Sequence, residues 1–291
     1  MGERNGDHRY VLTIDGAERP GLLHAVTGFL VDNRADIREI KQFDDELAGR
    51  YVCRVDFVVP GDGDDPGIEA LDASLDALRA DWQLTARVRP AADKQRVLIM
   101  VSKFAHCLND LLFRAHVDDL PIDIVAVVSN HPDHEDLARW HKVPFHHIPV
   151  TRDTKPHAEA RLLELVDQLD VDLVVLARYM QILSDDLAKT LSGRAINIHH
   201  SFLPSFKGAK PYHQAYERGV KTVGATAHYV TGDLDEGPII SQQVQEVDHS
   251  HTPADLVAAG RDTECKALSN AVRWHCEGRV FVQGRRTIVL R

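Results

Sequence analysis

The sequence predicts two α/β domains in tandem: a ferredoxin-like βαββαβ unit over residues 1–90 and a mostly parallel, helix-covered sheet over residues 95–291. Three observations support this prediction. The chain has 291 residues, about twice the ~150 expected of one domain. Short alternating strands dominate the first domain, whereas continuous apolar strands alternate with helices in the second. A short polar segment, Pro90–Gln95, separates the two patterns.

The first domain is expected to hold four strands and two helices in the order βαββαβ. The turn Glu18–Gly21 begins a helix with apolar residues at helical spacing, and the stretch Pro60–Gly67 breaks the chain before the second helix. Alternation in the third strand places Arg54 and Asp56 on the face opposite its aromatic residues. The strands are predicted at Tyr10–Ile14, Ile37–Phe43, Tyr51–Val59 and Trp82–Val88, and the helices over Leu22–Leu30 and Ile68–Leu78.

The second domain alternates apolar strands with helices. Such continuous apolar runs indicate a parallel sheet buried on both faces, in a Rossmann-like arrangement. Its strands are predicted at Val97–Val101, Ile122–Val128, Phe145–Val150, Val171–Ala177, Ala195–His199, Gly224–Val230, Ile239–Val247 and near Arg279–Val282. Its helices are predicted at Cys107–His116, Pro132–His141, Ala158–Leu169 and Pro253–Cys276.

Composition excludes several classes of protein. Apolar residues make up 44% and charged residues 27%, as in ordinary globular proteins. The 44 acidic and 34 basic side chains give a net charge of −10, which disfavours binding to nucleic acid or to an anionic membrane surface. No segment approaches the ~18 consecutive apolar residues of a membrane helix. The polar start, Met1–His8, lacks the apolar run of a signal peptide.

The four cysteines form no C-x-x-C pair. Cys265 and Cys276 are eleven residues apart on one predicted helix, which separates them by ~16 Å and prevents a disulfide. The thiols are therefore expected to be reduced, and the protein cytoplasmic.

Common catalytic signatures are missing. The sequence contains no G-x-x-x-x-G-K-[ST] loop for phosphate, no H-E-x-x-H pair for zinc and no G-x-S-x-G nucleophile turn. His134 and Glu135 are followed by Ala138 where a second zinc ligand would be needed. The sequence therefore does not contain the motifs that usually indicate a zinc hydrolase or a serine hydrolase.

Polar residues of another kind gather late in the chain. Asn197 and His199 stand at i and i+2 on the predicted strand Ala195–His199, so they face the same side. An amide can donate to a developing oxyanion, and an imidazole can move a proton near pH 7. Asp235 precedes the next strand and could orient the histidine or a water. From spacing alone, structural roles for all three remain open, and His200 points away as a structural residue.

The first domain resembles an ACT domain. The resemblance rests on Asp15, Arg19-Pro20-Gly21-Leu22-Leu23 and Val26 at the first strand-to-helix turn. It implies regulation by a small ligand, such as an amino-acid effector, or edge-to-edge pairing into a homo-oligomer, a dimer or tetramer. A helix N-terminus suits a carboxylate, although Pro20-Gly21 also makes a good helix start without any ligand.

The second domain resembles the folate-dependent formyltransferase family. The matching strings are N-I-H-x-S-x-L-P-S-F-x-G from Asn197, G-A-T-x-H-Y-V from Gly224 and L-D-E-G-P-I-I from Leu234. The resemblance implies that Asn197, His199 and Asp235 are catalytic. It also implies a pterin slot between the loop Ala177–Leu183, with Met180, Gln181 and Leu183, and the turn Thr231–Asp235. Many relatives carry Arg where this chain has Gln181.

Within that family, the chain resembles the formyltetrahydrofolate deformylases. Transformylases that take a phosphorylated amine have a Gly-rich loop after the first strand, but here Val101–Leu112 has no glycine and carries Phe104 and His106. The resemblance implies hydrolysis of the folate substrate, 10-formyltetrahydrofolate, to formate and tetrahydrofolate for one-carbon and purine metabolism, with no cofactor and no metal. Lys103 and His106 are expected to block amine entry or to bind formate, against the alternative that they pack and cap the helix.

Three alternatives stay open at this point. The chain could transfer the formyl group to an unrecognised amine, against which the altered loop argues. It could be a folate-binding sensor without catalysis. It could be a metal hydrolase that uses His199, His200, His213 or His228.

Overall fold

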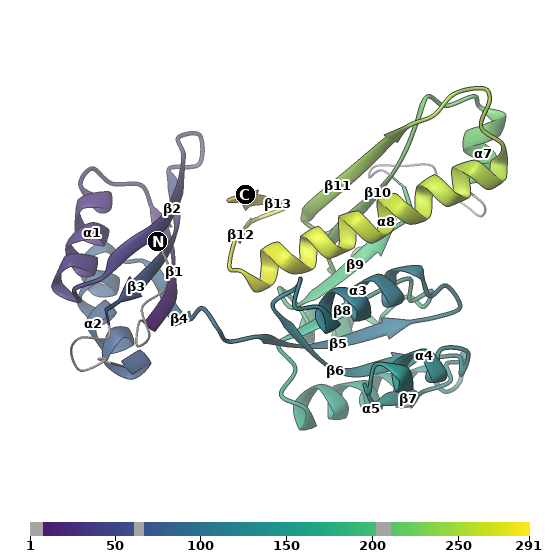
Figure 1. Ribbon diagram of the computed structural model, residues 1–291, viewed down its shortest axis with the longest axis horizontal. Coiled ribbons are helices and arrows are strands. Elements are labelled where there is room, and N and C mark those ends of the chain that lie inside the picture. The colour runs from purple at the N-terminus through teal and green to yellow at the C-terminus, as the bar shows by residue number, and fades with distance from the viewer. Residues whose placement is uncertain (1–7, 61–66, 202–210) are drawn as a thin grey trace. The chain divides into compact units, whose positions relative to one another are not determined.

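The computed structural model describes residues 8–60, 67–201 and 211–291. The chain divides into two compact units. One unit takes residues 1–93 together with 278–281 and 288–291, and the other takes residues 94–277 and 282–287. Figure 1 labels the elements of both units. The last residues of the chain thus return to the N-terminal unit.

The N-terminal unit is a four-stranded antiparallel sheet with the strand order β2-β3-β1-β4. This arrangement confirms the predicted ferredoxin-like fold. Its core lies between the sheet and two helices, with fully buried side chains such as Leu12, Val26 and Leu75. In chain order the elements are β1 (His8–Ala17), α1 (Leu22–Asp32), β2 (Asp36–Asp45), β3 (Arg50–Val59), α2 (Gly67–Trp82) and β4 (Thr85–Pro90).

The fourth strand begins later than predicted. Trp82 ends α2 and packs partly buried against the core, so it belongs to the helix. Gln83 then adopts a left-handed backbone with φ 54°, and the strand starts at Thr85. Sequence alternation from Trp82 to Val88 missed this helix end because tryptophan fits either element.

Both faces of β3 are buried, although alternation predicts a polar second face. Chain-terminal residues cover that face, since Phe281 and Leu290 pack on Val52. Arg54 and Asp56 lie among them as buried charges within an ion-pair network, and each keeps a partner of opposite charge. A distant segment of the same chain therefore makes a face that looks half-polar in sequence into a second, smaller core.

The second unit is built on a seven-stranded sheet in the order β11-β10-β9-β8-β5-β6-β7. Strands β5 to β9 run parallel, while β10 is antiparallel to both of its neighbours. The mostly parallel Rossmann-like sheet is thus confirmed. The strands are β5 (Gln95–Val101), β6 (Ile122–Ser129), β7 (Phe145–His147), β8 (Leu173–Leu176), β9 (Ala195–His199), β10 (Thr222–Tyr229) and β11 (Ile239–Glu246), followed by a separate pair, β12 (Val280–Gln283) and β13 (Arg286–Val289).

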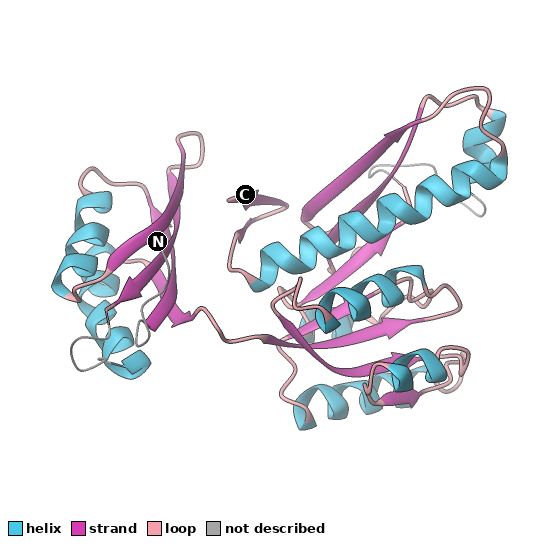
Figure 2. Cartoon of the chain, in the orientation of Figure 1, coloured by secondary structure: helices cyan, strands magenta, loops and turns pink. Residues whose placement is uncertain are grey.

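The helices of this unit pack on the sheet, as Figure 2 shows. Helices α5 and α6 cover one face through Leu162, Leu165 and Leu187, and the long α8 packs along β9, β10 and β11. Sequence periodicity missed α6, α7 and β13, because each is a single short element of seven residues or fewer. The helices are α3 (His106–His116), α4 (Glu135–Trp140), α5 (Lys155–Gln168), α6 (Asp185–Thr190), α7 (Pro211–Glu217) and α8 (Pro253–Cys276).

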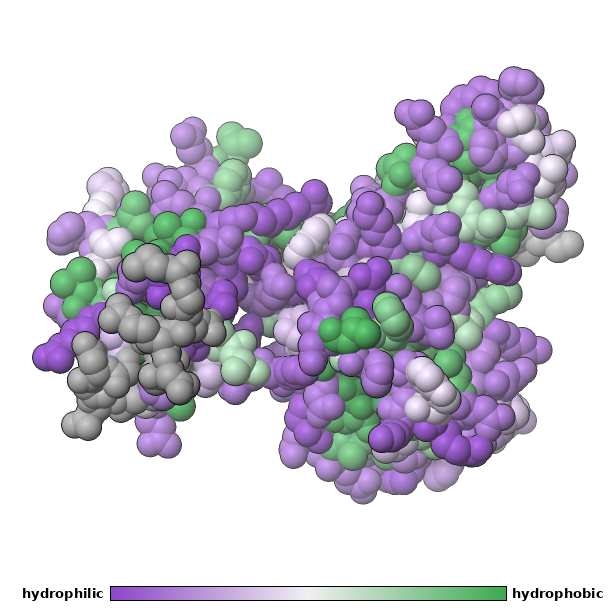
Figure 3. All heavy atoms as spheres, viewed as in Figure 1, coloured by the Kyte–Doolittle hydropathy of each residue, from purple (hydrophilic) through white to green (hydrophobic). Residues whose placement is uncertain are grey.

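The strand order indicates where a ligand would bind on the sheet. The chain fills the sheet from β5 to β7, then returns to the other side of β5 with β8 and β9. Ligands of open α/β sheets bind beside the carboxyl ends of the strands at such a reversal. The exposed surface in Figure 3 is mostly hydrophilic, in keeping with the 27% of charged residues. Among the described residues, no helix is both long and apolar enough to cross a membrane.

Candidate active site

A cavity of about 230 Å³ opens at the carboxyl ends of β8 and β9. Two loops form its walls, the segment that follows β8 and the segment that joins β10 to β11. Seven of the sequence-predicted site residues line it: Met180, Gln181, Leu183, Asn197, His199, Thr231 and Asp235. Residues separated by more than fifty positions in sequence are thereby brought to one place.

Strand pairing brings Asn197 and His228 together. The antiparallel register of β9 and β10 sets these two residues opposite each other, and the Asn197 amide donates from Nδ2 to His228 Nε2 at 3.3 Å. His228 is almost fully buried, and its Nδ1 is 2.8 Å from the Tyr229 carbonyl, which only accepts. The Tyr229 carbonyl therefore accepts from Nδ1–H, and Nε2 faces both the Asn197 amide and Asp235 Oδ1.

His199 lies between a carboxylate and a hydroxyl. Its Nδ1 is 3.2 Å from Asp235 Oδ2, and its Nε2 is 2.9 Å from Ser201 Oγ. A carboxylate accepts from Nδ1–H, which leaves Nε2 as the ring nitrogen that can take up and give back a proton. Ser201 is hydrogen-bonded to Nε2 in this structure, so Nε2 is already directed at an exchangeable hydroxyl.

The Asp235 carboxylate lies close to both His199 and His228. Its Oδ1 lies 3.7 Å from His228 Nε2 and 3.5 Å from the Asn197 amide. Burial raises the pKa of Asp235, but hydrogen bonds and charge interactions with His199 and His228 outweigh burial and hold this pKa well below its usual range. The carboxylate is therefore ionised at every pH near neutrality.

The turn that carries Asp235 is under tight backbone constraint. Asp235 itself adopts a left-handed conformation with φ 57°, which is uncommon for a residue other than glycine. Two residues later, Gly237 lies so near the β10 backbone that an added Cβ would sit 1.7 Å from the Tyr229 carbonyl oxygen. The turn can approach the end of β10 only because position 237 has no side chain.

The remaining walls of the cavity are apolar and exposed at its mouth. Met180, Ile182 and Leu234 are 54, 61 and 60% exposed, from the two facing loops. Ser102, at the end of β5, fastens the first loop, because its Oγ accepts from Met180 N at 2.9 Å and donates to Asn130 Oδ1 at 2.7 Å. Exposed apolar side chains on two fixed loops can sandwich a flat aromatic ring.

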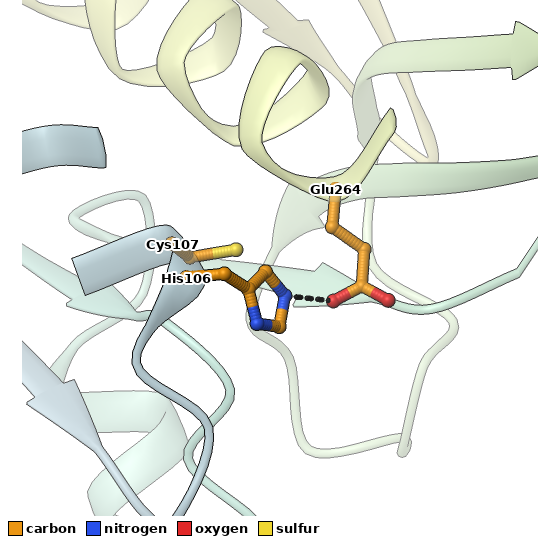
Figure 4. A group of neighbouring side chains, drawn as sticks. All are labelled: His106, Cys107 and Glu264. Atoms are coloured by element: carbon orange, nitrogen blue, oxygen red, sulfur yellow. Dashed lines mark hydrogen bonds and ion pairs between the residues drawn. The ribbon is translucent and has the colours of Figure 1, made fainter. Parts of the chain in front are cut away.

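Lys103 and His106 are not among the residues that line this cavity. His106 begins α3, and its Nε2 pairs with Glu264 Oε2 of α8 at 2.7 Å (Figure 4). Lys103 is exposed in the loop before that helix. The structure thus brings together the Asn197 cluster and the two facing loops, but it places these two residues outside the cavity wall.

Glu264 is a buried carboxylate surrounded by donors. Its side chain is 2% exposed, and besides His106 it accepts from the Tyr212 hydroxyl at 3.0 Å and lies 3.4 Å from Arg178 Nε. Burial raises the pKa of Glu264, but the hydrogen bond from His106 and the charge of Arg178 lower it overall. A carboxylate that is hydrogen-bonded to His106 and Tyr212 and ion-paired with Arg178 is a structural anchor between α3, α7 and α8.

Metal ligation finds limited support in this geometry. In the described parts of the chain, His106, Cys107 and Glu264 are the group whose ligand atoms come within 4.8 Å of one another (Figure 4). A hydrogen bond with Cys265 and burial raise the pKa of the Cys107 thiol. The four histidines considered for a metal hydrolase, His199, His200, His213 and His228, form no such group among the described residues.

Sequence reasoning named His228 only as a possible metal ligand and gave no individual role to three further residues of this neighbourhood, Ser201, Arg178 and Glu264. His228 occurs within the G-A-T-x-H-Y-V string, and a polar residue on an otherwise apolar strand was the available signal. Ser201 follows His200, and Arg178 lies within the predicted pterin loop Ala177–Leu183. Glu264 is a charged residue at a core position of α8, which helical spacing alone could have flagged.

Comparison with known proteins gives concordant matches. Residues 95–272 match the family model described as formyl transferase. A formyltetrahydrofolate deformylase of Corynebacterium sp. (strain P-1) is 64% identical over 283 residues, which cover 97% of this chain and 98% of the relative.

Solved structures extend the comparison to both units. The crystal structure of a formyltetrahydrofolate deformylase from Burkholderia mallei has a TM-score of 0.92 at 48% identity, and the match covers 98% of this chain and 100% of that chain. A glycinamide ribonucleotide transformylase from Symbiobacterium toebii has a TM-score of 0.64 at 31% identity, and it covers 69% of this chain and 97% of its own.

Proposed function

The chain belongs to the formyl transferase family, among its formyltetrahydrofolate deformylases, and from this premise we propose that it hydrolyses 10-formyltetrahydrofolate to formate and tetrahydrofolate. Water supplies the oxygen atom that ends in formate. The bond between N10 and the formyl carbon breaks, N10 takes up one proton of the water, and the other proton is released as the acid ionises to formate. The observation that supports this assignment is the convergence of Asn197, His199 and Asp235 on one cavity.

His199 is the proposed proton carrier. Its Nδ1 faces Asp235, so its Nε2 is the nitrogen that can accept a proton from the attacking water. The same nitrogen then returns the proton to N10 as the carbon–nitrogen bond breaks. Because the pKa of Asp235 lies well below its usual range, this carboxylate is too weak a base to keep the proton. It orients His199 and stabilises the imidazolium instead.

Asn197 is the proposed oxyanion donor. Attack on the formyl group places negative charge on its oxygen, and an amide N–H near that oxygen stabilises the tetrahedral intermediate. Nδ2 carries two hydrogens and contacts two acceptors, His228 Nε2 at 3.3 Å and Asp235 Oδ1 at 3.5 Å. We propose that the longer bond, to Asp235, gives way to a bond with the substrate oxygen. His228 thus serves as a positioning residue that fixes the rotamer of the amide.

Substrate recognition follows from the two loops. We propose that the pterin ring lies between Met180–Leu183 and Thr231–Asp235, with Gln181 and Thr231 beside it. Met180 N is already bonded to Ser102, and Thr231 Oγ1 donates to Asp233 O at 3.1 Å. These bonds fix the loops before substrate arrives, which supports recognition by a preformed slot.

The acceptor side favours water over an amine. The loop between β5 and α3 carries Phe104 and His106 rather than glycines, and His106 is fixed by Glu264. We propose that this packed loop excludes a phosphorylated amine. A role of Lys103 or His106 in binding formate finds no support in their position outside the cavity wall.

Regulation and assembly rest on the ACT-like unit. We propose a homo-oligomer formed through this unit and an amino-acid effector at the turn Pro20–Leu22. The turn is compatible with such a role, since Gly21 has φ 91° and caps α1 without a side-chain bond. All four cysteines are free thiols, in keeping with a cytoplasmic location. No cofactor or metal has a step in the proposed reaction.

The test measures formate and tetrahydrofolate released from 10-formyltetrahydrofolate without an amine present. Wild-type protein should release both in equal amounts. His199→Ala should lower turnover by ~10²–10⁴ because the proton carrier is lost, and Asn197→Ala by ~10²–10³ because an oxyanion donor is lost. His213→Ala, an exposed histidine of α7, is the matched control.

Each contrary result redirects the assignment. Folate binding without formate release would reject hydrolysis and favour transfer to an amine or a sensor. Full activity of Asn197→Ala would reject the assigned site. Loss of activity on chelation, with recovery on adding back metal, would overturn the metal-free reaction.

A further inference from the structure

Arg178 is a buried cation at the wall of the catalytic cavity. It follows β8 directly, lines the cavity with Asn197 and His199, and its side chain is only 10% exposed. Its Nε and Nη1 are buried and have no hydrogen-bond partner among the described residues. Buried polar groups are nearly always hydrogen-bonded, and a charged donor without a partner is costly. This guanidinium is therefore a site that lacks its acceptor.

The surroundings hold Arg178 in one place. Glu264 Oε2 lies 3.4 Å from Nε, and the ring of Phe104 lies 5.3 Å from the guanidinium carbon. The backbone of Arg178 is left-handed, with φ 65°, and its carbonyl accepts from Ser102 N at 3.3 Å. A non-glycine residue in this conformation stores strain, which is typical of functional sites. The side chain is thus preorganised rather than free to reach solvent.

The missing acceptor should be a small anion. Glu264 balances the charge of Arg178 from one side, but it is shared with His106 and Tyr212 and does not bond Nη1. A guanidinium prefers planar carboxylates, which accept more than one N–H. The proposed reaction generates one such anion, formate, at the carbon beside Asn197 and His199.

We propose that Arg178 binds the formate product, so that its guanidinium donates to the carboxylate as the carbon–nitrogen bond breaks. This inference rests on the proposed hydrolysis. Asp235 lines the same cavity and repels an anion. Formate is therefore attracted by Arg178 and repelled by Asp235. Product retention should be modest, and release rapid.

The experiment is a titration of the full-length protein with ¹³C-formate, followed by NMR line broadening, together with inhibition of hydrolysis by sodium formate. Arg178→Met should weaken formate binding about 10- to 100-fold, because a charge-assisted hydrogen bond is lost. Arg178→Lys, which keeps the charge without the fork, should give a smaller loss. Arg161→Met removes an exposed arginine of α5 and should leave formate binding unchanged.

The two arms separate this inference from the proposed function. Hydrolysis by wild-type protein together with equal formate affinity in wild type, Arg178→Met and Arg178→Lys would overturn the role of Arg178 and leave the deformylase assignment intact. Absence of hydrolysis would reject the function itself, whatever the titration gives. Should Arg178→Met fail to fold, unchanged formate affinity in Arg178→Lys together with unchanged inhibition would also overturn the proposal. Tetrahydrofolate affinity should stay within twofold in both variants, since Arg178 faces the one-carbon product.

Discussion

Two carboxylates with similar partners take different roles in this protein. Asp235 and Glu264 each contact histidine, and in both the pKa is lowered although burial opposes it. Asp235 is 25% exposed and faces the cavity, whereas Glu264 is 2% exposed beneath it. The histidine beside Asp235 keeps its second nitrogen for exchange, while Glu264 uses its own oxygens to bind helices together. Access to the cavity, rather than the identity of the pair, distinguishes the carboxylate with the proposed catalytic role from the one that anchors helices.

The first prediction tests the catalytic half of this contrast. Asp235→Asn should lower turnover by ~10²–10⁴, because an amide no longer fixes and stabilises the protonated His199. Its thermal midpoint should also fall, because a carboxylate with a lowered pKa stabilises the fold at neutral pH, so turnover is compared below the melting range of the variant. Asp186→Asn, an exposed change on α6, is the matched control. Turnover within threefold of wild type in Asp235→Asn would refute the contrast.

The second prediction tests the anchoring half. Glu264→Gln should lower the free energy of unfolding by ~1–3 kcal/mol, because it leaves Arg178 without its counter-charge and alters the bond to His106. Glu164→Gln breaks an exposed pair on α5 and should cost at most ~0.5 kcal/mol. Denaturant melts of both variants measure the difference. Equal stabilities would show that the buried network is not an anchor.

The pH dependence of that loss has a definite sign. The folded-state pKa of Glu264 is lowered, so its contribution is present above the unfolded-state value of ~4.3 and disappears as pH falls through the folded-state pKa. The stability difference between wild type and Glu264→Gln should therefore shrink as the solution is acidified below that value. A difference that stays constant down to strongly acidic pH would contradict the ion-pair interpretation.

The third prediction concerns His200, which senses both carboxylates. Burial, Arg178 and His199 lower the pKa of His200 to about 4, while Glu264 and Asp235 oppose them. NMR titration should find this pKa lowered further in Asp235→Asn and in Glu264→Gln, and raised in Arg178→Met. Because the folded form resists protonation, this residue should reduce stability as pH falls from ~6.5 toward 4. A shift in the opposite direction would refute the electrostatic link.

Sequence alone predicted the fold class and the placement of Asn197 and His199 on one strand face, because both depend on local periodicity, whereas the catalytic role of this pair stays a prediction. Asn197 and His199 share a strand face by simple alternation. His228 requires the register of β9 and β10, which no local pattern states. Arg178 and Glu264 become partners only when α8 packs over the sheet. The sequence can show that Glu264 is a charged residue at a core position of a helix, but it cannot show which residue pairs with it. Trp82 shows a different error. Local alternation predicted that it begins a strand, but in the structure it ends helix α2 and packs against the core.

The return of the chain end to the N-terminal unit has a consequence for biosynthesis. Phe281 and Leu290 cover Val52, so one face of a sheet made early in translation is completed by residues that are made much later. Until then that face presents Arg54 and Asp56, whose charges keep a nascent sheet hydrated and discourage it from pairing with other chains. Removal of residues 278–291 should consequently uncover the part of the protein that is synthesised first.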